Sequence, residues 1–203
     1  MTTRNDLKFR NLTPDDDIDI VVSLMMDTDP FIYHDLFGSH ENAVKVLPHM
    51  MKREIAIFSY DSFFVAERDG KIVGLAALYK YGDEWDSAAV RVAFIETDTP
   101  LPPSFDAVCS FFVKEHNYQH GIKACNICVA PDERGKGIGD YMVKQMIRAA
   151  GNSNIMLSVL ASNTAALSLY RKNGFRILYE YDDYGGYGNP DVKCYKMIYL
   201  RLQ

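Results

Sequence analysis

The segment from Val129 to Gly139 constrains the fold of this chain more than any other part of the sequence. It reads Val-Ala-Pro-Asp-Glu-Arg-Gly-Lys-Gly-Ile-Gly and lies between an apolar run typical of a strand and an amphipathic helix from about Ile138 to Ala150. Three glycines at alternate positions let the backbone turn tightly and leave several N–H groups pointing outward. With the positive end of the helix dipole and the side chains of Arg134 and Lys136, this turn is predicted to bind a phosphate group.

Two common phosphate-binding patterns do not fit this turn. A dinucleotide-binding fingerprint has the spacing G-x-G-x-x-G, whereas the glycines here are spaced G-x-G-x-G, and a Walker A loop would need G-x-x-x-x-G-K followed by Ser or Thr. The structural alternative is a tight turn without a ligand. Three glycines beside two cations argue against that alternative.

The order of strand and helix signals along the rest of the chain predicts one α/β domain of residues 1–203, with a mixed sheet and helices on both faces. Thr13 is a candidate N-cap of a first helix, with Pro14 at its first position. Asp69-Gly70 between two apolar runs predicts a type I′ hairpin. Strands are expected at 7–10, 63–67, 72–79, 125–130, 155–160, 175–181 and 193–202, and helices at 41–52, 138–150 and 164–173.

The stretch from Gly82 to Gly121 is less regular than the rest and is expected to be an insertion. Phe105, Val108 and Phe112 lie on one face of a helix that would follow Ser104 as its N-cap. We expect this helix to pack against the sheet and the segment to shape the pocket for a substrate.

Composition and charge exclude several classes of function. The chain has 203 residues, 48% of them hydrophobic and 24% charged, which is typical of a globular protein. Its formal charge is −5, and no basic run is long enough to follow a nucleic-acid backbone, so nucleic acid is not expected as a partner. No apolar run is long enough to cross a membrane, and the N-terminus lacks the apolar stretch of a signal peptide. We therefore expect a cytoplasmic protein, and a mildly acidic body suits a cationic substrate such as an amine.

A lone C-x-x-C motif is formed by Cys125 and Cys128. It could indicate a redox pair or half a metal site, but no second such motif accompanies it. Because the surrounding residues form a predicted strand, the two side chains are expected on opposite faces. We therefore expect small buried residues and no metal.

Two motifs together resemble the GNAT superfamily of N-acetyltransferases. The turn Arg134-Gly135-Lys136-Gly137-Ile138-Gly139 matches the family signature R/Q-x-x-G-x-G/A. About 25 residues later, the segment from Asn163 to Phe175 matches N-x-x-A-x-x-L-Y-x-K-x-G-F. The resemblance implies a mostly antiparallel sheet that is splayed at the cofactor site, and transfer of an acetyl group from acetyl-CoA to a primary amine through a tetrahedral intermediate. The acceptor would be a small molecule or a peptide or protein amine.

The resemblance also implies which residues contact the cofactor. The strand that ends at Cys128 and Val129 would offer backbone groups to pantetheine and to the thioester oxygen. The amides of the glycine turn would hold the pyrophosphate. Asn163 would contact the cofactor arm or simply cap its helix, and Lys172 would reach a phosphate of coenzyme A. The cofactor-binding candidates are thus Cys128, Val129, Arg134, Gly135, Lys136, Gly137, Ile138, Gly139, Asn163 and Lys172.

Tyr170 is the candidate catalytic residue, because the resemblance places a donor to the departing thiolate at this position; the alternative is a buried core aromatic. Full proton transfer from an ordinary tyrosine to a thiolate is uphill by about 2 kcal/mol, which favours a hydrogen-bond donor. A base must also deprotonate the amine. The candidates for that role are Glu84, Glu96, His116, His120 and Asn126.

Two other functions are left open by the sequence. One is a non-catalytic acetyl-CoA sensor that keeps the glycine turn without turnover, against which Tyr170 argues. The other is a nucleotide-binding α/β protein, against which the second motif argues. The acyl chain preference and a homodimeric state are also left open.

Overall fold

A computed structural model of the chain describes residues 7–29, 31–55, 57–80, 85–116, 121–181 and 192–201, with side chains 114–116 excepted. Its elements run along the chain as β1 (Leu7–Asn11), α1 (Ile18–Met26), α2 (Ile32–Phe37), α3 (His40–Lys52), β2 (Phe63–Arg68), β3 (Lys71–Lys80), α4 (Ser87–Glu96), α5 (Phe105–His116), β4 (Ile122–Val129), the short 3-10 turn η2 (Pro131–Glu133), α6 (Ile138–Ala149), β5 (Ile155–Leu160), α7 (Thr164–Lys172), β6 (Arg176–Tyr181) and β7 (Cys194–Tyr199).

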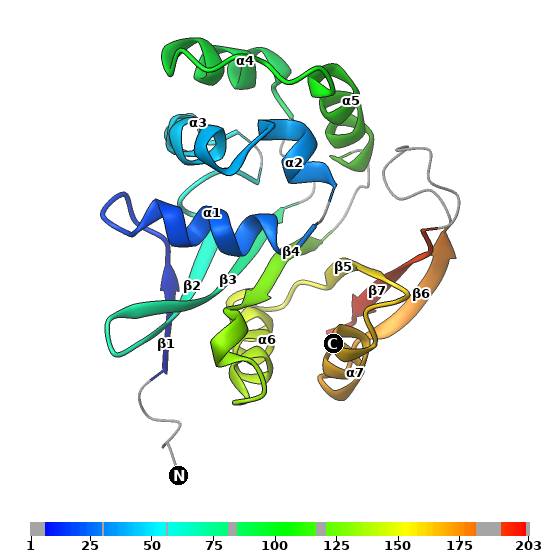
Figure 1. Cartoon of the computed structure of the whole chain (residues 1–203). Helices are drawn as coiled ribbons and strands as arrows, with labels where there is room; N and C mark the ends of the chain where they lie inside the picture. The colour runs from blue at the N-terminus through cyan, green and yellow to red at the C-terminus, as the bar shows by residue number, and fades with distance from the viewer. Residues whose placement is uncertain are drawn as a thin grey trace.

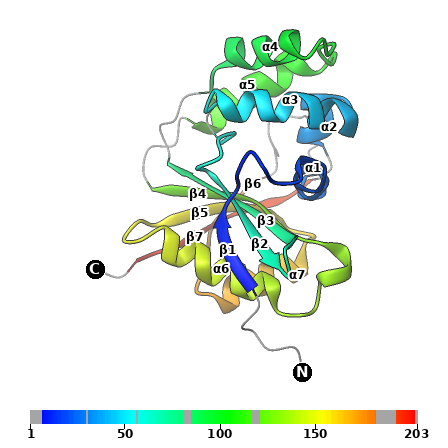
Figure 2. The same ribbon diagram turned by 90° about the vertical axis from the view of Figure 1, so that its left-hand side faces the viewer.

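The strands form one open sheet in the order β1-β2-β3-β4-β5-β7-β6. Neighbouring strands are antiparallel except β4 and β5, which are parallel. Helices α1 to α5 lie on one side of the sheet, and α6 and α7 lie on the other (Figures 1 and 2). The mixed, mostly antiparallel sheet with helices on both faces confirms the predicted fold class.

The sheet is forked in the middle. Strands β4 and β5 pair only where Ile122 and Lys123 lie beside Ile155 and Met156, and the two strands separate beyond these residues (Figure 1). The splayed sheet expected from the family resemblance is therefore present. Beyond these residues, none of the described strands pairs with the facing edges of β4 and β5, and a molecule that enters between them can use their backbone groups.

Each side of the sheet has its own apolar core. The core under α1 to α5 is rich in aromatic rings, among them the fully buried Phe37, Phe58, Phe63 and Phe94. The core under α6 and α7 is mainly aliphatic and includes Ile138, Met142 and Leu157. In the part of the chain that the structure describes, no helix is long and apolar enough to cross a membrane.

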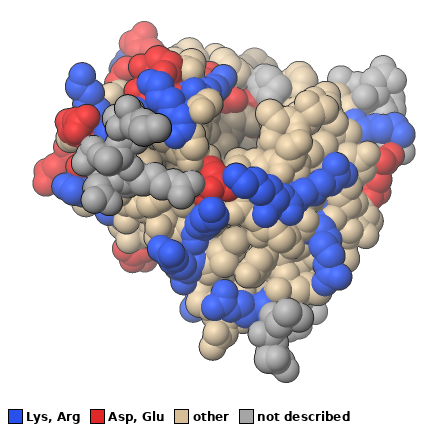
Figure 3. All heavy atoms as spheres, turned by 90° about the horizontal axis from the view of Figure 1, so that it is seen from below, with Lys and Arg blue, Asp and Glu red and all other residues tan. Residues whose placement is uncertain are grey.

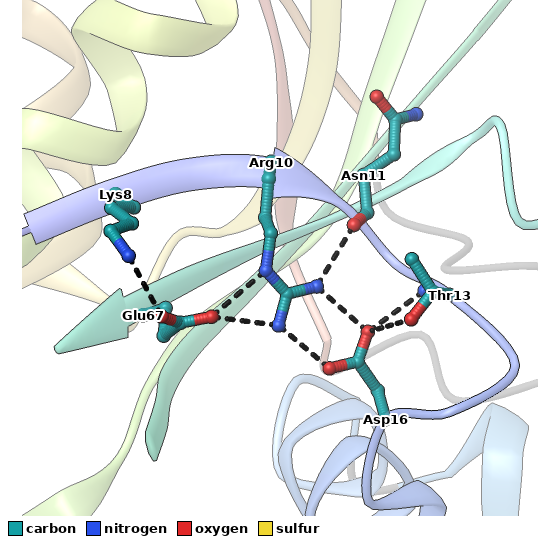
Figure 4. A network of polar contacts seen from close by, with 6 residues as sticks. All are labelled: Lys8, Arg10, Asn11, Thr13, Asp16 and Glu67. Atoms are coloured by element: carbon teal, nitrogen blue, oxygen red, sulfur yellow. Dashed lines mark hydrogen bonds and ion pairs between the residues drawn. The ribbon is translucent and has the colours of Figure 1, made fainter. Parts of the chain in front are cut away.

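The first helix begins later than predicted. Thr13 does not cap it: α1 starts at Ile18, and the side chain of Asp17 accepts hydrogen bonds from the N–H groups of Asp19 and Ile20. The cause is a polar network around Asp16, shown in Figure 4. The Asp16 carboxylate accepts two bonds from Arg10, at 2.8 and 2.7 Å, and two from Thr13, at 2.8 and 2.9 Å. These bonds hold residues 13–16 in a turn, so the helix cannot start there.

The helical layer above the sheet is larger than predicted. Helices α2 and α4 were not expected, and α5 runs on to His116. The prediction that α5 packs mainly against the sheet is wrong, because its main contact is with α2. Helix α4 packs on α3. Figure 2 shows α4 and α5 as an outer layer above α3 and α2. Within the expected insertion at 82–121, the described residues thus add an outer layer of helices on the α1–α5 side of the sheet.

The expected placement of the two cysteines is also wrong. Cys128 and Cys125 both pack into the core under α1 to α5, so they lie on the same face of the sheet. The reason is a bulge in β4: Leu75 pairs with Cys128 but Ala77 pairs with Cys125, and Asn126 between them has a φ of 53°. Among the described residues, no group of three His, Cys, Asp or Glu side chains could hold a metal ion.

Candidate functional site

A cavity of about 160 Å³ opens at the fork between β4 and β5. Tyr170, Ala166 and Asn163 line it from the α7 side, and Thr28 and Tyr33 line it from the α1–α2 side. Further lining residues come from β3, α5, β4, β5 and β6, namely Tyr79, Phe111, Phe112, Lys123, Cys125, Asn126, Ile127, Ser158, Leu160 and Tyr181. The cavity therefore runs through the plane of the sheet and joins its two sides.

The glycine turn leads directly from β4 into α6. Gly135 and Gly137 have positive φ angles of 77° and 84°, which glycine adopts without strain. Gly137 is the N-cap of α6 and, as a glycine, has no side chain to cap the helix. Among the described residues, none accepts a hydrogen bond from the N–H groups of Gly137, Ile138 or Gly139. Outward N–H groups at the positive end of a helix form a site for a phosphate.

The third glycine of the turn has a different role. A side chain at Gly139 would meet Leu169 at 3.2 Å and Val129 at 3.8 Å. Its missing side chain thus lets α6 pack closely on α7 and on the end of β4. At Gly135 and Gly137 an added Cβ would meet nothing within 4 Å, so these two positions require glycine for its φ angle.

The cations of the turn are held by nearby oxygen atoms. Arg134 donates from Nε to the carbonyl oxygen of Val129 at 3.0 Å and lies 3.8 Å from a carboxylate oxygen of Asp27. Lys136 pairs with Glu133 at 3.2 Å, and Glu133 also pairs with Arg68. Both side chains are about half exposed, so a phosphate can draw them from these partners at small cost.

Helix α7 brings two predicted residues to the cavity. Asn163 caps the helix, because its Oδ1 accepts a hydrogen bond from the N–H of Ala166 at 3.0 Å, and it also lines the cavity. Tyr170 is 6% exposed and its ring packs near Phe175. No described residue forms a hydrogen bond with its hydroxyl group. Burial raises the pKa of Tyr170, with a smaller contribution from Cys128 and Cys125, so the hydroxyl stays protonated and able to donate.

Lys172 lies outside the cavity, in a cluster around Asp140. The buried Asp140 carboxylate, in the first turn of α6, pairs with Lys144 at 2.7 Å and with Lys172 at 3.1 Å, and it accepts from Asn173 at 3.1 Å. The bond from Lys144 is the main cause that lowers the pKa of Asp140, followed by those from Lys172 and Asn173. The cluster ties α7 to the start of α6. Figure 3 shows the molecule from below, with Lys and Arg side chains spread over the middle of the view and Asp and Glu side chains mostly toward its edges.

The candidate bases are not all at the cavity. Glu96 lies at the end of α4 in the outer layer, where it pairs with His49 and Arg53, so the structure does not bring it to the fork. Asn126 lines the cavity. Glu84, His120 and the side chain of His116 lie outside the described residues.

Sequence reasoning missed the residues that approach the cavity from the α1–α2 side. Tyr33 belongs to α2, a helix that was not predicted, and its hydroxyl group donates to Oδ1 of Asn126. Asp140 was missed as well, although its place three residues after Gly137 in the first turn of α6 is a position where carboxylates are favoured.

Comparisons with known proteins agree with this geometry. A family model described as "Acetyltransferase (GNAT) domain" matches residues 59–177, which is more than half of the chain. Comparison with curated protein sequences gives no match. Among solved structures, one described as an acetyltransferase has 20% identity and a TM-score of 0.69, covering 96% of this chain and 100% of its own.

Two further solved structures are informative. A GNAT family acetyltransferase from Elizabethkingia anophelis with acetyl-CoA bound has 18% identity and a TM-score of 0.57, over 98% of this chain and 100% of its own. A spermidine N-acetyltransferase chimera from Vibrio cholerae and hSSAT has 16% identity and a TM-score of 0.60, over 97% and 96%. At these identities, the likeness shows the fold.

Proposed function

The chain belongs to the GNAT acetyltransferase family, and on that premise we propose that it transfers the acetyl group of acetyl-CoA to a primary amine of a small molecule, peptide or protein. The amine would attack the thioester directly, through a tetrahedral intermediate. The observation that carries this proposal is the forked sheet, where a cavity joins the start of α7 and Tyr170 to the opposite side of the sheet. Residues 1–203 would act as a single N-acetyltransferase domain.

The cofactor side of the proposal rests on backbone geometry. The N–H groups of Gly137, Ile138 and Gly139 would hold the pyrophosphate, with Arg134 and Lys136 adding positive charge. The open edges of β4 and β5 would receive the pantetheine arm. This arrangement fits coenzyme A, because its phosphates need N–H donors such as those of the glycine turn. Its amide-rich arm, which follows the phosphates, needs backbone groups such as those of the strand edges.

Tyr170 would assist the departure of the thiolate. Tyr170 lines the cavity, and its hydroxyl group is protonated at neutral pH because its pKa is raised. The raised pKa makes full proton transfer to the thiolate more unfavourable than for an ordinary tyrosine. We therefore propose a hydrogen bond from Tyr170 to the leaving sulfur, with proton transfer lagging behind bond cleavage.

The test is release of free thiol from acetyl-CoA in the presence of a panel of amines, together with calorimetry of coenzyme A binding. We expect binding that weakens as salt is added, because phosphate contacts are partly electrostatic. We expect thiol release that depends on both an amine and the protein. Binding without thiol release for any amine would contradict the proposal and favour a non-catalytic acetyl-CoA sensor.

A further inference from the structure

Asn126 has an unusual backbone conformation for its place in the fold. Among the described residues, four other than glycine have positive φ angles, and three of them, Glu54, Asp69 and Asp98, lie in turns. Asn126, with a φ of 53°, lies inside β4 at the bulge. Such conformations are unfavourable, although asparagine tolerates them better than most residues, and they concentrate at functional sites.

The side chain of Asn126 is only half satisfied. Its Oδ1 accepts a hydrogen bond from the hydroxyl group of Tyr33 and lies 3.4 Å from Oγ1 of Thr28. Its Nδ2 is buried and has no hydrogen-bond partner among the described residues. A buried N–H group without a partner is costly, so native proteins rarely retain one without a reason. A structural link between β4 and α2 accounts for the hydrogen bond to Oδ1, but it gives no role to the buried Nδ2 group.

The position of this amide relates it to the acceptor. Asn126 lines the cavity, and its partners Tyr33 and Thr28 lie on the α1–α2 side of the sheet. The glycine turn and α7 lie on the opposite side, as Figure 1 shows. A cofactor bound at that turn would reach the fork from the side of α6 and α7. A molecule on the α1–α2 side of the cavity would then be the amine that attacks the thioester.

We infer that Asn126 determines specificity for the acceptor, and that its Nδ2 donates a hydrogen bond to an oxygen atom close to the reacting amine. This inference rests on the proposed function. An amide N–H group needs a lone pair: an ammonium group has none, and the lone pair of the free amine is used in the attack. The preferred acceptor therefore carries a carboxylate, carbonyl or hydroxyl oxygen near its nitrogen, as amino acids, amino-acid amides and amino alcohols do.

The charges around the cavity agree with this class of acceptor. Among the described residues that line the cavity, one carries a carboxylate, namely Asp29. Its Oδ1 accepts hydrogen bonds from the N–H groups of Phe31 and Ile32 at the start of α2, both at 2.9 Å. A cation, Lys123, also lines the cavity. A polyamine carries several positive charges and would be favoured by several carboxylates, which this part of the lining does not provide.

The experiment compares three groups of amines by thiol release from acetyl-CoA: α-amino acids, amino-acid amides with amino alcohols, and polyamines with simple alkylamines. Asn126→Asp keeps an oxygen for Tyr33 and replaces the N–H donor with a carboxylate oxygen. Asn126→Gly removes the amide and suits the positive φ angle. Tyr33→Phe is the matched control, because it breaks the link to α2 and leaves the amide in place.

We expect the wild type to prefer oxygen-bearing amines. Asn126→Asp and Asn126→Gly should lower kcat/KM for those amines by about ten- to a hundredfold and change it less than about threefold for the oxygen-free amines. Tyr33→Phe should change all groups by a similar factor. Coenzyme A affinity should stay the same in all three variants.

Two outcomes would overturn the inference. If the two Asn126 variants lower kcat/KM by one common factor for every amine, as Tyr33→Phe does, Asn126 is a structural link and the inference is wrong, while the proposed function stands. If the wild type releases no thiol with any amine, the proposed function is wrong and the inference is wrong with it.

Discussion

The two sides of the forked sheet obtain their shape from different kinds of interaction. The side proposed to bind the cofactor depends on local backbone geometry: Gly135 and Gly137 set the turn by their φ angles, and α6 begins at Gly137, which has no side chain to cap it. We call it the cofactor side. The opposite side, proposed to bind the acceptor and called the acceptor side below, depends on side chains that are far apart in the chain, such as Tyr33 from α2 and Phe112 from α5. The proposed cofactor site is thus formed by residues that are contiguous in the chain, whereas the proposed acceptor site is assembled from residues that are far apart in it.

The largest effect is expected where the two sides meet, at Tyr170. Tyr170→Phe keeps the ring that packs near Phe175 and removes only the hydroxyl group. If this group stabilises the transition state, kcat should fall by roughly 10²–10⁴ with little change in coenzyme A affinity. Because its pKa is raised, ionisation of Tyr170 should not reduce the rate up to pH 10. Steady-state kinetics on a responsive amine, with a melting curve, measures this effect. Wild-type kcat in the variant would make Tyr170 a core aromatic.

The cofactor side is tested next by comparing two glycines with the same conformation. Gly137 and Gly70 have φ angles of 84° and 74°, and an added Cβ would meet nothing within 4 Å at either position. Valine at either position should therefore lower the free energy of unfolding by a similar amount, about 1–2 kcal/mol. Gly137→Val should in addition weaken coenzyme A binding by about tenfold or more, because a shifted turn no longer directs its N–H groups to the pyrophosphate.

Calorimetry on both variants, with denaturant unfolding, separates strain from binding. Gly70→Val is the control, since Gly70 lies in the turn between β2 and β3. Equal coenzyme A affinity in the two folded variants would show that the glycine turn is not the pyrophosphate site.

The difference between the two sides also explains how far the sequence could be interpreted. The glycine turn, the strand 155–160 and the helix that carries Asn163 and Tyr170 were predicted because each has a local signal. Helix α2 was missed because six residues carry too little periodicity. Its N-cap is Phe31, and the side chain that accepts from the N–H groups at its start is that of Asp29, two residues earlier. The bulge at Asn126 was missed because it depends on pairing with β3, and the pattern of a regular strand then misplaced the two cysteines.

Asp140 tests whether the cofactor side depends on local geometry alone. Its carboxylate joins α6 to Lys172 and Asn173 at the end of α7. Asp140→Asn should lower the free energy of unfolding by about 1.5–3 kcal/mol, because charged hydrogen bonds to a buried group are lost. We also expect kcat to fall severalfold, since α7 carries Tyr170. Lys144→Met is the control: it removes only the i,i+4 pair and should cost about 0.5 kcal/mol with kcat unchanged. Unchanged kcat in both variants would show that the cluster serves stability alone.

The smallest effect is expected at Asp16, which lies on the acceptor side and away from the cavity. This carboxylate resembles Asp140 in being held by several donors, but its partners lie elsewhere: Thr13 is in the turn before α1, and Arg10 is on β1, where it also pairs with Glu67 of β2 (Figure 4). Arg10 is the main cause that lowers the pKa of Asp16 from 3.8 to about 2. A lowered pKa stabilises the fold above the ordinary value, so this contribution should be complete at neutral pH and be lost as the pH falls from about 4 to 2.

Asp16→Asn should therefore lower the free energy of unfolding at pH 7 by about 1–2 kcal/mol, and the difference from the wild type should shrink below pH 4. Because Asp16 touches neither the glycine turn nor the cavity lining, kcat, acceptor preference and coenzyme A affinity should all match the wild type. Denaturant unfolding between pH 2 and 7, with kinetics at pH 7, measures both parts. A loss of acceptor preference would mean that the start of α1 positions Thr28 and Tyr33 through the helix, and that the acceptor side extends farther from the cavity than its lining residues.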